Sequence, residues 1–245
     1  MRGRPRPVRA APRPPWFATR VPDSASAPSA PSRRAIFLDR DGTLIHDPGY
    51  LGDPSGVVLF PEVADTLRAL AAAGFALVVC TNQSGIARGK YTVAQYERVA
   101  HRLDELLAAE GVRLLATYYC PFHPEGTVVP WATDHDDRKP APGMWLRAAR
   151  DHGLDLARSY SMGDGERDVV AGRRAGTTAI LLAAGRDKWP LPAGAPTGGP
   201  LDPDFVARDL REAAIWILRR EGKPLPDRPG APLLPPIVAA AAPGR

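Results

Sequence analysis

Short apolar runs of strand length alternate with longer helix-like segments along residues 34–222 of this 245-residue chain. The run Phe75–Cys80 is continuously apolar, which is typical of a strand buried on both faces. The segment Thr92–Glu110 begins with a capping-box pattern and ends before Gly111. This alternation predicts the α/β fold class, with a parallel β-sheet and helices on both of its faces.

The expected elements follow one another in a regular order. The expected strands are Ala35–Asp39, Phe75–Cys80, Leu114–Tyr119, Ser159–Met162, Ala179–Leu182 and Phe205–Ala207. The expected helices are Pro61–Ala73, Thr92–Glu110, Pro142–His152, Arg167–Ala175 and Arg211–Arg220. Ligands of such sheets bind beyond the carboxyl ends of the strands. Polar residues that directly follow a strand are therefore the candidate site residues.

Three segments have a composition that disfavours regular structure. Residues 1–33 are rich in Pro and Arg, residues 184–203 in Gly and Pro, and residues 223–245 in Pro and Ala. They hold 20 of the 28 prolines, and proline lacks a backbone donor. We expect a disordered N-terminal tail over 1–33, one domain over 34–222 with an insertion at 184–203, and a C-terminal tail over 223–245.

The charge of the chain is uneven. The net charge is +5, and residues 1–32 carry six arginines against one acid, Asp23, so the remainder is neutral. A nucleic-acid partner is therefore not expected for the folded part. A membrane partner is not expected either, because no apolar run is long enough to cross a bilayer. Two cysteines cannot build a disulfide framework, which favours a cytoplasmic protein. We expect a monomer.

Two carboxylates follow the first expected strand. The string Leu38–Leu44 reads LDRDGTL, with Asp39 and Asp41 one residue apart. Residues i and i+2 of a strand point to the same side, so a strand that continues this far directs both carboxylates into one cleft. One carboxylate can then attack phosphorus while the other transfers a proton to the leaving group. A simple Asp-Gly turn is the alternative interpretation of this string.

Three further polar strings follow later strands or precede a helix. Thr81–Gly89 is rich in hydroxyl, amide and glycine groups that can hold a phosphate. Arg138 and Lys139 precede the helix that starts near Pro142, where cations can neutralise a phosphoryl group. Asp164 follows the fourth strand and, with Asp39, can complete a Mg²⁺ site of oxygen ligands. Each string has a simpler interpretation. Thr81–Gly89 could be an ordinary polar loop, the string with Arg138 and Lys139 a solvated charge cluster, and the string with Asp164 a turn and helix N-cap.

Taken together and in this order, the four strings resemble the haloacid dehalogenase (HAD) superfamily of aspartate-nucleophile phosphatases. More narrowly, Phe37–Thr43 (FLDRDGT), Thr81–Gly89 (TNQSGIARG) and Arg138–Met144 (RKPAPGM) are similar to the D,D-heptose 1,7-bisphosphate 7-phosphatase and histidinol phosphatase family. The similarity covers about Arg34 to Arg220. It implies a Rossmann-like, doubly wound parallel sheet without a large cap domain, because only short insertions follow the first and third strands.

The resemblance also implies residue roles. Asp39 is the expected nucleophile that forms a phosphoaspartate, and Asp41 the expected acid and base. Thr81 and Lys139 are expected to hold the phosphoryl oxygens, and Mg²⁺ is expected on Asp39, the backbone oxygen of Asp41, and Asp164. The expected substrate-binding residues are Asp47, Gly49, Tyr50, Asn82, Gln83, Ser84 and Arg138. Arg138 is expected to recognise the rest of the substrate, with its second phosphate as one candidate group.

One loop departs from the family pattern, which has a Cys-x-His pair and a later Cys-x-Cys pair for Zn²⁺. The first pair here reads Cys120-Pro121-Phe122, and the second reads His135-Asp136-Asp137. Structural zinc sites favour Cys and His at fixed spacing. Cys120, His123, His135 and Asp137 are acceptable ligand types, but the sequence favours a loop closed by packing without zinc.

The expected activity is Mg²⁺-dependent hydrolysis of a small phosphorylated metabolite, most plausibly a heptose 1,7-bisphosphate that loses its 7-phosphate. Histidinol phosphate or another small phosphomonoester is the alternative substrate. A domain without catalysis that serves interactions through its Pro/Arg tails is the alternative from a different functional class, and it is disfavoured because all four chemical strings are intact.

Overall fold

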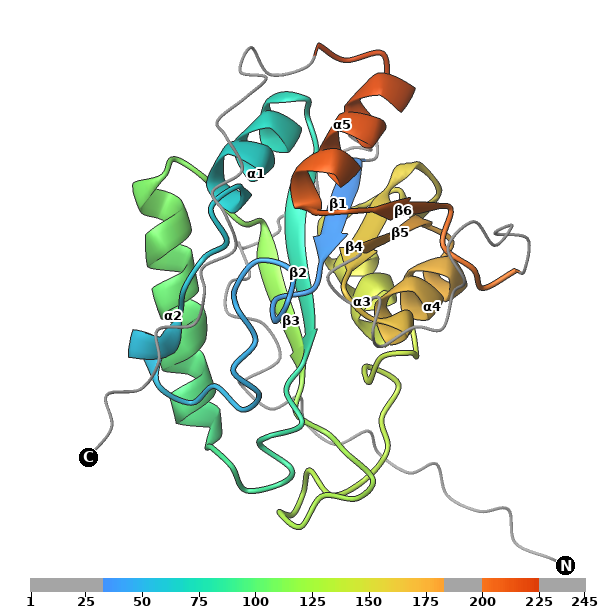
Figure 1. Cartoon of the computed structure of the whole chain (residues 1–245). Coiled ribbons are helices and arrows are strands. Elements are labelled where there is room, and N and C mark those ends of the chain that lie inside the picture. The colour runs from blue at the N-terminus through green and yellow to red at the C-terminus, as the bar shows by residue number, and fades with distance from the viewer. Residues whose placement is uncertain (1–32, 183–199, 225–245) are drawn as a thin grey trace, which may run out of the picture.

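The computed structural model describes residues 33–182 and 200–224, and Figure 1 shows their arrangement. A six-stranded parallel sheet has the order β3-β2-β1-β4-β5-β6. Its strands are β1 (Ala35–Leu38), β2 (Ala76–Asn82), β3 (Ala116–Cys120), β4 (Tyr160–Gly163), β5 (Thr178–Leu182) and β6 (Phe205–Ala207). The chain winds outward from β1 in both directions, so the order reverses between β1 and β4. This reversal is where open α/β sheets bind ligands.

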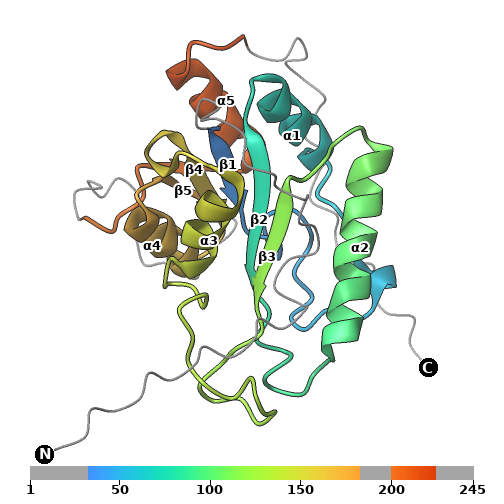
Figure 2. The same cartoon turned by 180° about the vertical axis from the view of Figure 1, so that it is seen from behind.

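Helices cover both faces of the sheet. They are α1 (Val63–Ala72), α2 (Val93–Ala109), α3 (Gly143–His152), α4 (Glu166–Ala175) and α5 (Leu210–Arg220), with short 3₁₀ turns η1 (Pro54–Gly56) and η2 (Leu156–Arg158). Helices α1, α2 and α5 lie on one face, and α3 and α4 on the other (Figures 1 and 2). The expected α/β class with a doubly wound parallel sheet is therefore confirmed.

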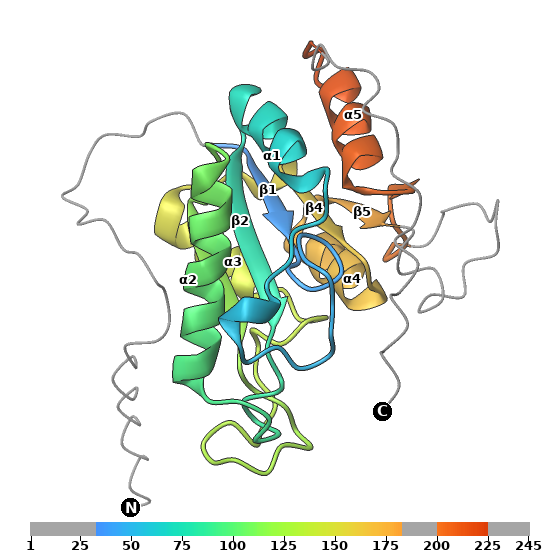
Figure 3. The same ribbon diagram turned by 60° about the vertical axis from the view of Figure 1, so that its left-hand side comes forward.

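The alternation of side chains along β1 explains this two-sided packing. Ile36 and Leu38 belong to the hydrophobic cluster shared with α1 and α5, whereas Ala35 and Phe37 belong to the cluster shared with α3. All four side chains are fully buried. A strand buried on both faces is the expected partner of helices on both sides. Figure 3 shows α1 and α5 over this central strand.

Element boundaries differ slightly from those expected. Strand β1 ends at Leu38 rather than Asp39, and β2 continues to Asn82. The capping box of α2 is present, since Thr92 and Gln95 exchange side-chain and backbone hydrogen bonds. The turns η1 and η2 were not expected, because three-residue elements leave no periodic signal.

The loops after β1 and β3 contain little regular secondary structure. Residues 39–62 contain only η1 and isolated bridges, and residues 121–142 contain turns. Neither loop forms a separate cap domain in the part of the chain that the structure describes. Among the described residues, none of the helices combines the length and apolarity that crossing a membrane requires.

The expected domain limits are only partly within the described residues. Arg33 was expected in the tail, but it bridges to Leu154 and belongs to the ordered part. The remaining tail residues 1–32, the insertion residues 184–199 and residues 225–245 lie outside the described residues. The expectations for them stay predictions.

Candidate active site

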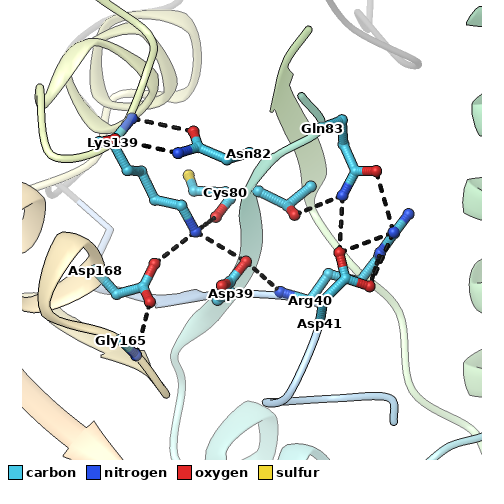
Figure 4. Close-up of polar contacts among 10 residues, drawn as sticks. Asp39, Arg40, Asp41, Cys80, Asn82, Gln83, Lys139, Gly165 and Asp168 are labelled. Atoms are coloured by element: carbon cyan, nitrogen blue, oxygen red, sulfur yellow. Dashed lines mark hydrogen bonds and ion pairs between the residues drawn. The ribbon is translucent and has the colours of Figure 1, made fainter. Parts of the chain in front are cut away.

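The four polar strings meet at the carboxyl ends of the strands. Asp39 follows β1, Asp164 and Asp168 follow β4, and Lys139 comes from the loop before α3. Figure 4 shows Asp39 and Asp168 on either side of the Lys139 side chain. Residues far apart in the sequence therefore converge where a parallel sheet places its ligands.

Lys139 is buried, and all three hydrogens of its ammonium have acceptors. Its Nζ lies 2.8 Å from Asp39 Oδ1, 2.5 Å from Asp168 Oδ1 and 3.0 Å from the carbonyl oxygen of Cys80. Burial by itself lowers the pKa of the Lys139 ammonium, but the charges of Asp168 and Asp39 more than offset it, so the pKa is raised. Lys139 is thus a fixed positive charge beside Asp39.

Asp39 presents one carboxylate oxygen to two donors. Its Oδ1 accepts from Lys139 and, at 2.7 Å, from the backbone N–H of Arg40. The side chain is about one-tenth exposed at the bottom of the site. A carboxylate fixed by two donors through one oxygen keeps the other oxygen for chemistry, which suits a nucleophile.

Asp168 is a buried carboxylate that also caps the N-terminal end of helix α4. Its Oδ2 accepts from the backbone N–H of Gly165 at 3.1 Å, which caps α4, while its Oδ1 faces Lys139. Burial, followed by the charge of Asp39, raises the pKa of the Asp168 carboxyl although Lys139 opposes the shift. The site therefore holds more negative charge than a single ammonium balances.

Asp164 lies directly against the loop that follows β1. A Cβ added to Gly42 would lie 2.4 Å from Asp164 Oδ2, and Gly42 has φ +76°. Any side chain at residue 42 would therefore clash with Asp164 and strain the backbone. The glycine of the LDRDGTL string is needed because the Asp164 carboxylate packs over it.

The acidic residues fit a divalent cation. Asp39, Asp164 and Asp168 each offer a carboxylate oxygen, and these three atoms lie within 4.8 Å of one another. Magnesium prefers oxygen ligands of this kind, and a cation there would neutralise the excess negative charge. Asp39 and Asp164 were expected at the metal. Asp168 was not, and the expected backbone oxygen of Asp41 stays a proposal.

Asp41 lies beside Asp39 but faces a different partner. Its carboxylate pairs with Arg40 through both oxygens, at 3.0 Å from Nε and 2.9 Å from Nη2. Because β1 ends at Leu38, strand alternation does not set this direction, which differs from the expectation. Burial raises the pKa of the Asp41 carboxyl, with Arg40 opposing and Asp39 adding to the rise. A raised pKa helps a carboxyl to donate a proton.

Residues 81–83 were expected to contact phosphate or substrate. The Thr81 hydroxyl and the Gln83 amide lie 2.9 Å apart, and both side chains are about 1% exposed. Asn82 exchanges two hydrogen bonds with the backbone of Lys139, at 3.0 and 3.1 Å. The side chains of Asn82 and Gln83 therefore bind the protein here, in contrast to the expected substrate contacts.

The other expected substrate residues lie around this centre. Asp47, Gly49 and Tyr50 are exposed, and the Asp47 carboxylate accepts from the Gly49 N–H at 2.8 Å. Ser84 is half-buried. Arg138 is half-buried and donates to the Phe122 carbonyl oxygen at 3.3 Å. Burial, together with nearby Arg167 and Arg88, lowers the pKa of Arg138. Three neighbouring guanidinium groups of this kind favour the binding of an anion.

Sequence reasoning missed two site residues, Asp168 and Arg40. Asp168 lies four residues after Asp164, and its place near the start of the expected helix Arg167–Ala175 was the available signal. Its carboxylate reaches back because α4 starts at Glu166. Arg40 is 1% exposed although charged. No sequence pattern signals a buried arginine between two aspartates, since charged residues are usually exposed.

The loop 120–137 contains the four residues that were weighed as possible zinc ligands. Among the described residues, the group of converging metal-binding side chains does not include Cys120, His123, His135 or Asp137. The Phe122 ring stacks on the His135 ring with centroids 4.2 Å apart, and it packs edge-on against Trp131. Asp137 pairs with Arg147.

The position of His123 also disfavours a cation. Arg88 Nη2 lies 2.9 Å from His123 Nε2, and the Glu125 N–H donates to Nδ1 at 3.0 Å. Burial, with the charges of Arg138 and Arg88, lowers the pKa of the His123 imidazole. A guanidinium beside a ring nitrogen opposes a metal cation there. The residues present do not fit zinc.

Comparisons with known proteins show which family the chain resembles. Residues 137–213 match the family described as HAD-hydrolase-like. The chain is 46% identical to the D-glycero-β-D-manno-heptose-1,7-bisphosphate 7-phosphatase of Escherichia coli O6:H1 over 190 residues, or 77% of this chain and 90% of that protein. It is 38% identical to the α-anomer enzyme of Burkholderia mallei over 154 residues, or 63% and 82% of the two chains.

A solved structure is similar as well. The D,D-heptose 1,7-bisphosphate phosphatase from B. bronchiseptica, complexed with magnesium and phosphate, superposes with a TM-score of 0.65 at 30% identity. The match covers 76% of this chain and 99% of that one.

Proposed function

This chain belongs to the D-glycero-D-manno-heptose-1,7-bisphosphate 7-phosphatase family of HAD-like hydrolases, and from that premise we propose that it hydrolyses the 7-phosphate of a heptose 1,7-bisphosphate with Mg²⁺. The observation that carries the proposal is the convergence of Asp39, Lys139, Asp164 and Asp168 at the carboxyl ends of the strands. That arrangement supplies a nucleophile, a fixed positive charge and oxygen ligands for a cation at one point.

The first half of the reaction forms a phosphoaspartate. A carboxylate oxygen of Asp39 attacks phosphorus, and the bond between phosphorus and the sugar oxygen breaks. Asp41 gives its proton to the departing oxygen, which leaves as the alcohol. Thr81 and Lys139 stabilise the charge on the phosphoryl oxygens. Asp39, Asp164, Asp168 and the backbone oxygen of Asp41 would hold Mg²⁺, which would neutralise negative charge during the transfer.

The second half returns the enzyme to its starting state. Asp41, now ionised, takes a proton from water, and the water oxygen attacks the phosphoaspartate. The bond between phosphorus and Asp39 breaks, and inorganic phosphate leaves. Asp41 thus serves as acid and then as base, which requires that its carboxyl be held within reach of both oxygens.

Substrate selection rests on the residues around this centre. Arg138, with Arg88 and Arg167 nearby, provides positive charge for a second phosphate. Asp47, Gly49, Tyr50 and Ser84 are proposed to contact the sugar. The relatives at 46% and 38% identity are named for opposite anomers, so the anomer is decided by assay. We also propose a monomeric, cytoplasmic enzyme.

The deciding experiment measures phosphate release by the full chain with Mg²⁺. The two heptose 1,7-bisphosphate anomers, heptose 7-phosphate and histidinol phosphate are compared at equal concentration. We expect kcat/KM to be highest for one bisphosphate anomer. A higher value for histidinol phosphate would assign the alternative substrate, and no turnover of any phosphomonoester would exclude the phosphatase.

A further inference from the structure

Gln83 occupies the centre of a buried polar network beside the proposed acid. Its Nε2 lies 2.9 Å from Asp41 Oδ2 and 2.9 Å from Thr81 Oγ1. Its Oε1 accepts from Arg40 Nη2 at 3.1 Å and from the Tyr91 hydroxyl at 2.6 Å. The side chain is 1% exposed. Figure 4 shows Gln83 directed at the Arg40–Asp41 pair.

These four contacts fix the orientation of the amide. Arg40 has only donors to offer, so the amide atom facing it must be the oxygen. Asp41 Oδ2 already accepts from Arg40 Nη2 and therefore acts as an acceptor, so the amide atom facing it must be the nitrogen. Exchanging the oxygen and nitrogen would place donor against donor and acceptor against acceptor in a buried site, which is costly. Gln83 therefore holds one defined geometry.

This geometry also directs the hydroxyl of Thr81. A threonine oxygen can donate one hydrogen bond and accept others. Because Gln83 Nε2 donates to Thr81 Oγ1, the hydroxyl acts as the acceptor in that contact. Its own proton is then left to donate in another direction, as a group that binds a phosphoryl oxygen must.

Tyr91 anchors the network from outside the catalytic groups. Its ring is 6% exposed, and its hydroxyl donates to Gln83 Oε1. A Cβ on Gly85 would lie 2.2 Å from the Tyr91 ring, so the ring packs tightly against the loop that carries Gln83. The hydrogen bond of the Tyr91 hydroxyl therefore reaches Asp41 through Gln83.

We propose that Gln83 is a positioning residue whose amide holds the carboxyl of Asp41 and the hydroxyl of Thr81 in their reactive directions, with Tyr91 and Arg40 fixing the amide. The inference rests on the proposed function, since it assumes that Asp41 protonates the leaving group. Gln83 does not contact substrate in this role. Its loss affects kcat rather than KM, and it matters most where protonation of the leaving oxygen is limiting.

The test compares a sugar phosphate with an activated aryl phosphate, whose leaving group needs little protonation. Gln83→Glu keeps the shape of the side chain but removes both donors, and Gln83→Ala removes the amide. In each variant we expect kcat for the sugar phosphate to fall by about 10²-fold, and the ratio of the two kcat values to change by at least about tenfold.

A double-mutant cycle identifies the residue through which Gln83 acts. In the Asp41→Asn background, the additional effect of Gln83→Ala on this ratio should disappear, because the acid is already absent. If the ratio still changes by the same factor, Gln83 does not act through Asp41 and the inference is wrong. Equal losses on both substrates in the single variants, with the fold retained, would also overturn it.

Tyr91→Phe tests the network without altering Gln83. It removes a single hydroxyl, and we expect the ratio to change several-fold with KM unchanged. Tyr119→Phe is the matched control, because its buried hydroxyl has no hydrogen-bond partner among the described residues and lies outside this hydrogen-bond network. The control should keep the wild-type ratio.

The Tyr91→Phe measurement remains decisive if the Gln83 variants do not fold. A wild-type ratio in Tyr91→Phe would then overturn the inference. Wild-type enzyme that hydrolyses neither substrate would instead show that the proposed function itself fails.

Discussion

At the scale of single residues, the site depends on opposite charges held in a water-poor environment. Lys139 forms ion pairs with both Asp39 and Asp168, and Arg40 forms one with Asp41. Each buried charge thus has a partner, as burial of an ionised group requires. The two pairs also separate the roles of the two aspartates of the first string: one faces the metal ligands, and the other faces the Gln83 network.

Asp39→Asn should abolish turnover while leaving the fold intact. The amide is a poor nucleophile towards phosphorus and a poorer ligand for Mg²⁺, and we expect kcat to fall on the order of 10⁴-fold or more. Acid-quenched wild-type enzyme should show a phosphoprotein by mass spectrometry that the variant lacks. Asp65→Asn, at an exposed site on α1, is the control. Near wild-type activity in Asp39→Asn would rule out the covalent route.

At the scale of elements, two loops are stabilised by different kinds of contact. The turn after β4 is tied to the site by Asp168, which caps α4 and pairs with Lys139. A Cβ at Gly163 would lie 2.4 Å from the Asp168 Cβ, so the strand end and the helix start are packed directly together. The loop 121–142 is held by the Phe122 stack and by the pair between Asp137 and Arg147.

Asp168→Asn should weaken the binding of magnesium and loosen the position of the Lys139 side chain. Partners of this kind are worth roughly 10- to 100-fold in metal affinity or activity. We expect a higher Mg²⁺ concentration for half-maximal activity, measured by titrating activity with the metal. Glu166→Gln is the control, because Glu166 is exposed in the same turn of α4. An unchanged Mg²⁺ requirement in Asp168→Asn would place Asp168 outside the metal site.

The loop 121–142 is predicted to be closed without zinc. Elemental analysis of the purified protein should find well under one equivalent of zinc. Phe122→Ala should lower the melting temperature or speed proteolysis of the loop, since it removes the stack on His135. Added zinc should not restore either property. Stoichiometric zinc whose removal lowers the melting temperature would contradict this, because a structural zinc site contributes folding free energy.

At the scale of the whole molecule, function is concentrated at one edge of one sheet. The carboxyl ends of β1, β2 and β4, the loop before α3 and the first turn of α4 supply the proposed catalytic and metal-binding groups. The helices contribute the cores that fix those strand ends. Residues 1–32 and 225–245 lie outside the described residues and supply none of these proposed groups. We propose that the described domain suffices for catalysis.

Removal of both tails tests this sufficiency. A chain lacking residues 1–32 and 223–245 should keep kcat within a few-fold of the full chain, because the tails lie outside the alternating pattern. Melting temperature and kcat on the preferred bisphosphate are measured side by side. A large loss of kcat at an unchanged melting temperature would show that a tail reaches the site.

The sequence by itself determined the element order and much of the site. The alternation of apolar runs with helical segments is a local, periodic signal, so every strand and α-helix of the described residues was expected within a few residues of its ends. The strings at strand ends likewise identified Asp39, Lys139 and Asp164 as neighbours, because parallel strands bring their carboxyl ends to one edge.

Only the tertiary structure decided which partner each side chain takes. Whether Asp168 caps a helix or faces Lys139 depends on how closely β4 and α4 pack, and it does both. Gln83 was expected to meet substrate, and burial under Tyr91 turned its amide to Asp41 instead. The direction of a loop side chain follows from contacts between segments distant in sequence, and no local periodicity encodes it.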